Sequence, residues 1–93
     1  MTIAETIREK LTASFAPASL DVVDESVLHE GHAGHRPGGE THFNVRIVSN
    51  AFDGMSRIER QRRVYAALAD EMRSHVHALS LTTLTPAETW NEH

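Results

Sequence analysis

The sequence predicts a single small domain of the α/β (α+β) class with a three-stranded mixed sheet. Three observations predict it: apolar residues recur at helical spacing near the N-terminus, three short segments have strand character, and a second helical segment separates the last two strands. The expected element order is α-β-β-α-β-α. Because 93 residues is the length of one domain, we expect residues 1–93 to fold as one unit.

The first helix is predicted between Thr2 and Pro17. Thr2 and Glu5 have the spacing of a capping box, and Pro17 cannot continue a helix. One apolar stripe at i, i+4 spacing is formed by Ile3, Ile7, Leu11 and Phe15. This stripe is the face that we expect to enter the core.

Two strands and a long loop are expected next. Residues 20–25, LDVVDE, are short and β-branched, so they predict a strand. Residues 26–40 are rich in glycine and histidine, which is typical of a loop. Residues 42–49 alternate, with Phe43, Val45 and Ile47 on one side of the second strand.

The second helix is predicted to begin at a capping box formed by Ser56 and Glu59. Helical spacing is shown by Ile58, Tyr65, Leu68 and Met72. Residues 76–84 predict the third strand. A short last helix is expected from Thr85 as cap, Pro86 and Glu88, with Trp90 as its anchor in the core.

This topology predicts where the histidines meet. A helix joins the second and third strands, so they should be parallel, whereas the first two strands should be antiparallel. His42 and His77 then begin neighbouring strands at one end of the sheet, where the loop also arrives. The loop histidines that can approach this end are His29, His32 and His35.

Imidazole is a common metal ligand, so this convergence indicates a metal site. The structural alternative is that His77 shares the orientation of Leu79 and Leu81 and is a half-buried strand residue. We expect His42 to be solvated and His75 to interact with the carbonyls that end the second helix. From the residues alone, a ligand and a structural histidine both remain open for His77.

Composition narrows the classes of function. The formal charge of −4 argues against a protein whose main task is binding nucleic-acid backbone, although it allows a local basic patch. No cysteine is present, so neither a disulfide framework nor a self-contained thiolate site is available. With no apolar stretch long enough to cross a membrane and no targeting pattern, we expect a cytoplasmic protein that has no membrane partner.

Four segments, LDVVDES, GGETHFNVRIVSNAFDG, RQRRVYAAL and VHALSL, together resemble the BolA family in order and spacing. The resemblance covers nearly the whole chain and implies the family's type-II KH-like fold. The chain departs from the family pattern in RQR, where Arg-His-Arg is common, and in the PAETW segment, which is one residue longer than usual.

The resemblance implies a function in iron–sulfur cluster binding. BolA proteins pair with monothiol glutaredoxins, and the heterodimer holds a bridging 2Fe-2S cluster. The implied ligands from this chain are His77 and His29, with His32 as the alternative to His29. The glutaredoxin cysteine and a glutathione would supply the other two. The implied function is therefore a non-enzymatic adaptor in cluster assembly, trafficking or iron regulation, monomeric when free.

The second helix indicates the alternative function, which is DNA binding. Four of the chain's nine basic side chains fall in one segment: Arg57, Arg60, Arg62 and Arg63. They form either a solvated helix face or a docking face for DNA, and bacterial BolA proteins are also described as transcriptional regulators of the stress response. The sequence Gly54 to Arg57 lacks the second glycine of the KH domain's RNA-clamping loop.

A third alternative is a small zinc hydrolase built on His29, His32 and His77. No carboxylate stands at a spacing that identifies a general base for it. We therefore rank it below the adaptor and the DNA-binding regulator.

Overall fold

The computed structural model describes residues 2–25 and 41–91, and these residues form a three-stranded sheet with helices packed on it. The elements are, in chain order, α1 (Ile3–Phe15), β1 (Ser19–Asp24), β2 (His42–Val48), the 3-10 helix η2 (Asn50–Phe52), α2 (Arg57–Ala67), α3 (Ala69–Ser74), β3 (Ala78–Leu84) and the 3-10 helix η3 (Ala87–Asn91). The predicted fold class is confirmed. Two details differ, because the second helix is divided into α2 and α3 and the last helix is a 3-10 helix.

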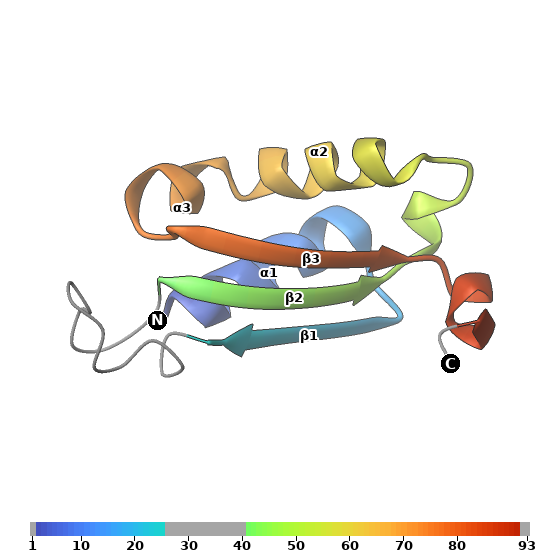
Figure 1. Ribbon diagram of the computed structural model, residues 1–93, viewed down its shortest axis with the longest axis horizontal. Coiled ribbons are helices and arrows are strands. Elements are labelled where there is room, and N and C mark those ends of the chain that lie inside the picture. The colour runs from blue at the N-terminus through green and yellow to red at the C-terminus, as the bar shows by residue number, and fades with distance from the viewer. Residues whose placement is uncertain (1, 26–40, 92–93) are drawn as a thin grey trace.

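The strand arrangement is the predicted one. The sheet order is β1-β2-β3, with β1 antiparallel to β2 and β2 parallel to β3. The helices α1 and α2 lie on one side of the sheet, and α2 runs alongside β3 (Figure 1). Within the described residues, β1 and β3 are therefore the two edge strands.

The helix α1 begins and ends as its sequence dictates. The Thr2 hydroxyl accepts a hydrogen bond from the Glu5 N–H at 3.1 Å, which satisfies one of the free donors of the first turn. Ala16 ends the helix in a left-handed conformation with φ of 42°, directly before Pro17. The buried residues of the helix are Ile7, Leu11 and Phe15, as the apolar stripe predicts.

The central strand β2 supplies the middle of the core. Phe43, Val45 and Ile47 are at most 1% exposed, whereas Asn44, which points to the other face, is exposed. Phe52 of η2 is also buried and packs against Phe15, with ring centroids 5.1 Å apart. The covered face of the sheet is thus apolar, and the alternation predicted for residues 42–49 is confirmed.

The predicted apolar face of the second helix is correct for Leu68 and Met72, which pack in or against the core, but wrong for Ile58 and Tyr65. Ile58 is 62% exposed and Tyr65 is 39% exposed, whereas Val64 and Leu68 are buried. The stripe that faces the core instead begins with Arg60. This residue is 6% exposed, and its guanidinium forms a salt bridge with Glu88. No helix among the described residues has the length and apolar character that crossing a membrane requires.

The C-terminal segment also differs from its prediction. The capping box exists, because the Glu88 N–H donates to the Thr85 hydroxyl at 3.3 Å and the Thr85 N–H donates to the Glu88 carboxylate at 2.8 Å. Trp90, however, is 83% exposed and does not anchor η3 in the core. Thr85, which is buried, and Glu88 hold this segment instead.

Candidate functional site

The first residues of β2 and β3 meet at one end of the sheet, as predicted. His42 is paired in register with Ala78, so His77 lies one position before the strand begins. The His77 N–H donates to the Thr41 carbonyl at 2.8 Å, which holds the His77 backbone beside the start of β2. In Figure 1 these two strand starts lie at the same end of the molecule. The predicted juxtaposition of His42 and His77 is therefore confirmed.

The two imidazoles are near neighbours with different environments. Their ring centroids are 6.2 Å apart and the rings meet edge to face, at 73°. His42 is half-buried, and its Nδ1 lies 2.9 Å from the Thr41 hydroxyl. His77 is exposed, so the interpretation of it as a half-buried strand histidine is wrong. An exposed imidazole on a fixed backbone can reach a metal held by another molecule.

The other candidate ligands lie outside the described residues. His29, His32 and His35 all belong to the segment 26–40, so their approach to His77 stays a prediction. Within the described residues, no group of three or more histidine, aspartate or glutamate side chains could hold a metal ion. At this end of the sheet, the described residues therefore provide two imidazoles as possible metal ligands, those of His42 and His77.

His75 has a different partner from the expected one. Its Nδ1 lies 2.7 Å from the Ser74 hydroxyl, rather than against the carbonyls that end the helix. Its backbone N–H donates to the Glu71 carbonyl at 2.9 Å. The side chain is exposed, so His75 serves as a control for an exposed histidine near His77.

The four predicted arginines do not form one face. Arg57, Arg62 and Arg63 are exposed, but Arg60 is buried and does not belong to a docking surface. Its Nε donates to the Met55 carbonyl at 3.0 Å, and its Nη1 donates to the Thr83 carbonyl at 3.1 Å. The prediction of a nucleic-acid contact by Arg60 is therefore wrong, because its donors are committed inside the domain.

Glu88 completes the environment of Arg60. Its carboxylate accepts from Arg60 Nη1 at 2.6 Å and from Nη2 at 3.1 Å. These hydrogen bonds and the one from the Thr85 N–H lower the pKa of Glu88 from 4.5 to about 2. The sequence showed the capping box that positions Glu88, but it gave no signal of a partner 28 residues away.

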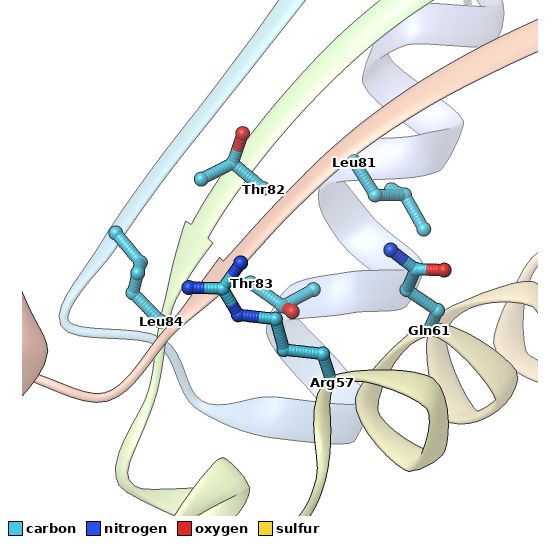
Figure 2. A pocket seen from close by; sticks show the side chains of 6 residues that line it. All are labelled: Arg57, Gln61, Leu81, Thr82, Thr83 and Leu84. Atoms are coloured by element: carbon cyan, nitrogen blue, oxygen red, sulfur yellow. The ribbon is translucent and has the colours of Figure 1, made fainter.

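A small groove lies between α2 and the carboxyl-terminal half of β3, whereas His77 directly precedes the first residue of this strand (Figure 2). Its volume is about 150 Å³, and it is lined by Arg57, Gln61, Leu81, Thr82, Thr83 and Leu84. Figure 2 shows the side chains of Arg57 and Gln61 on α2 beside the carboxyl-terminal half of β3. No sequence motif indicated this groove, although the i, i+4 spacing of Arg57 and Gln61 places both on one side of the helix.

Known proteins resemble this chain over most of its length. The BolA-like protein family model matches residues 11–88. SufE-like protein 1, chloroplastic/mitochondrial, of Arabidopsis thaliana is 51% identical over 86 residues, which cover 88% of this chain but 23% of that protein. The DNA-binding transcriptional regulator BolA of Escherichia coli is 47% identical over 88 residues, covering 95% of this chain and 80% of the relative.

A solved structure agrees with these sequence matches. BolA1 from Arabidopsis thaliana superposes with a TM-score of 0.85 at 43% identity, covering 95% of this chain and 96% of that one. Because relatives with organellar names also match the chain, the cytoplasmic location stays a prediction. The sequence matches and the shared architecture establish that this chain belongs to the BolA-like protein family.

Proposed function

We propose that this chain is an adaptor that shares a bridging 2Fe-2S cluster with a monothiol glutaredoxin. The observation that supports the proposal is the exposed imidazole of His77, fixed at the start of β3 beside His42. The cluster is cargo that the pair carries or senses, and the chain's own task is to bind and orient it. His77 is the proposed ligand from the described residues.

The possible metal ligands of this chain are compatible with a cluster that is shared with a partner protein. A 2Fe-2S cluster takes four ligands, and two histidines on one iron are an established alternative to thiolates. The chain has seven histidines and no cysteine, and its described residues hold no three-ligand group. The missing thiolates must therefore come from outside, which agrees with a glutaredoxin cysteine and a glutathione. His29, or alternatively His32, is the proposed second ligand.

The backbone around His77 suits this role. The bond from its N–H to the Thr41 carbonyl ties His77 to the start of β2, while the side chain remains exposed. A ligand on a rigid element is held more accurately than a ligand on a loop. His77 therefore provides a ligand at a fixed position.

Copurification with a monothiol glutaredoxin and glutathione tests the proposal. We expect the native pair to show the visible absorption and circular dichroism of a 2Fe-2S cluster. His77→Ala should change these spectra strongly, and of His29→Ala and His32→Ala only the one that removes the second ligand should. His75→Ala is the matched control and should leave them unchanged. Identical spectra for His77→Ala and the native pair would show that His77 is not a ligand.

A second candidate function is duplex DNA binding by α2. Two observations favour it: Arg57, Arg62 and Arg63 are exposed on this helix, and the relative from Escherichia coli is named a DNA-binding regulator. The affinity for a DNA duplex should fall with salt, and each arginine-to-alanine variant should reduce the slope by about 1 if it contacts a phosphate. A chain that binds no duplex, or binds it independently of salt, does not have this function.

A further inference from the structure

The outer edge of β3 carries the backbone groups that form one wall of the groove. The Ser49 N–H donates to the Leu84 carbonyl at 2.9 Å, so the backbone groups of Leu84 face β2. Successive residues of a strand direct their backbone groups to opposite sides. The N–H and C=O groups of Leu79, Leu81 and Thr83 therefore point away from β2, along the edge of the sheet.

Side chains of α2 already bind two of these three carbonyls. The Tyr65 hydroxyl donates to the Leu79 carbonyl at 3.3 Å, and Arg60 Nη1 donates to the Thr83 carbonyl at 3.1 Å. A long peptide strand beside β3 would need both carbonyls as acceptors, so these two bonds oppose its addition. A chain that ends opposite Thr83 does not need the Thr83 carbonyl, because no further residue follows that could donate to it.

The backbone groups between these two bonds match the end of a parallel chain. In a parallel pair, an edge residue donates to the carbonyl that precedes its neighbour and accepts from the N–H that follows it. An added chain that runs in the direction of β3 would therefore use both backbone groups of Leu81. Its last residue would donate its N–H to the Leu81 carbonyl and place its carboxylate at the Thr83 N–H. The edge thus suits the C-terminus of a chain better than its middle.

Positive charge lies where this carboxylate would arrive. Arg57 lines the groove, and Figure 2 shows its guanidinium directed toward β3 beside Thr83 and Leu84. Arg57 is also the first residue of the 11-residue helix α2, whose amino-terminal end carries a partial positive charge. The strand β3 has no charged residue that would repel an anion. Because a guanidinium binds a carboxylate through charge-assisted hydrogen bonds, the groove favours a free C-terminal carboxylate.

The wall opposite the strand edge also suits an extended chain. Gln61 lines this wall, and its side-chain amide is directed toward Leu81 (Figure 2). A side-chain amide provides both donors and an acceptor, which the outward backbone groups of an added chain require. The groove volume of about 150 Å³ is too small for a helix, whose diameter is about 10–12 Å. An extended chain end is therefore the occupant that fits both walls.

We propose that the groove between α2 and β3 binds the free C-terminus of an extended segment of a partner protein. Arg57 and the Thr83 N–H bind the terminal carboxylate, the Leu81 backbone pairs with the last residues, and Gln61 contacts their outer edge. The proposal does not depend on the iron–sulfur function, because the groove lies beside the last four residues of β3 and His77 precedes the first.

Fluorescence anisotropy of the native chain with labelled hexapeptides tests the proposal. The peptides are Gly/Ser-rich and end in Ala, Val or Leu, each with a free carboxylate and, as its matched control, with a C-terminal amide. We expect at least one free acid to bind, and its amide to bind at least about tenfold more weakly, because the amide has no charge for Arg57. Equal binding of the acid and the amide, or no binding of any acid, would overturn the proposal.

Two arginine variants test the contact to the carboxylate. Arg57→Ala should weaken binding of the free acid by about tenfold and abolish most of the difference between acid and amide. Arg62→Ala is the matched control, because it removes an exposed arginine of the same helix that does not line the groove. Equal effects of the two variants would show that binding reflects only the general charge of α2, which is contrary to the proposal.

Amide chemical shifts of the native chain locate the bound peptide. Addition of the free acid should move the signals of Leu81 and Thr83, whose N–H groups act as donors, and leave the signal of His77 in place. Shifts confined to other parts of the chain would contradict this site. Labelled oligo(dT) is included as a competing class of ligand. Binding of this oligonucleotide without binding of any peptide would also overturn the proposal.

Discussion

Arg60 and Glu88 join α2 to η3 through two hydrogen bonds, at 2.6 Å and 3.1 Å, although 28 residues separate them. The same guanidinium also donates to the carbonyls of Met55 and Thr83. One buried side chain therefore connects the turn before α2, the end of β3 and the C-terminal segment. Arg60 is a structural residue, although its sequence context indicates a surface cation.

Replacement of Arg60 should destabilise the domain strongly. Arg60→Ala removes donors from the Met55 and Thr83 carbonyls and leaves a gap beside Phe52, whose ring centroid is 5.9 Å from the guanidinium carbon. We expect the free energy of unfolding to fall by about 2–4 kcal/mol in urea titrations. Arg62→Ala, on the exposed side of the same helix, should change it by less than about 0.5 kcal/mol. Equal losses in the two variants would contradict the structural role of Arg60.

The contribution of Glu88 should depend on pH in the acidic range. Its pKa is lowered from 4.5 to about 2 in the folded chain, mainly by Arg60, so folding favours the ionised carboxylate. The resulting stability is present above pH 4.5 and is lost as the pH falls toward 2. Thermal unfolding of the native chain and of Glu88→Gln should therefore differ at neutral pH and converge as the pH falls. A difference in Tm that does not change between these pH values would refute this coupling.

Truncation of Leu68 should destabilise the domain far more than truncation of Ile58. Leu68 is 1% exposed and Ile58 is 62% exposed. Leu68→Ala should lower the free energy of unfolding by about 2–5 kcal/mol, because it opens a cavity in the core. Ile58→Ala should change it by less than about 0.5 kcal/mol. Chemical denaturation of both variants tests whether Ile58 lies outside the core, although the helical spacing grouped it with Leu68.

Lys10 of α1 and Glu71 of α3 form a pair that a double-mutant cycle can measure. Lys10 Nζ donates to both carboxylate oxygens of Glu71, at 2.9 Å and 2.8 Å, and Glu71 is 8% exposed. Lys10→Met should lower the free energy of unfolding by about 1–3 kcal/mol, because the carboxylate loses its partner. Combining it with Glu71→Leu should recover much of this loss. Additive losses in the cycle would mean that the two side chains act independently.

His77 should contribute little to folding. Its side chain is exposed, so His77→Ala should change the free energy of unfolding by less than about 0.5 kcal/mol. This measurement separates a ligand from a structural residue, since cluster spectra should change while stability does not. A large loss of stability would indicate that His77 has a structural role, and its effect on the spectra would then be indirect.

Local signals predicted much of the fold. The N-caps at Thr2, Ser56 and Thr85 all form, because each depends on residues three positions apart, and at Thr85 both bonds of the capping box are present. The alternation in β2 and the parallel pairing with β3 followed from strand pattern and connection length. The meeting of His42 and His77 could be predicted because it needed only this topology.

The predictions that were wrong share a cause, which is that contacts between distant segments of the chain decided the outcome. Arg60 has the sequence context of a surface cation until η3 brings Glu88 to it, and its burial displaces the expected apolar face of α2. Trp90 is exposed because the ion pair and the capping box, rather than an aromatic ring, hold η3. Helical spacing alone could not choose between the stripe of Ile58 and the stripe of Val64, since both have the same period.

The length of β3 sets the distance between His77 and the groove beside α2. Its seven residues extend for about 20 Å, with His77 before the first residue and the groove beside the last four. A partner that contacts only His77 would therefore leave the groove uncovered. The surface beside the carboxyl end of β3 then remains exposed in such a pair, and a mutation in the groove should leave the proposed cluster spectra unchanged.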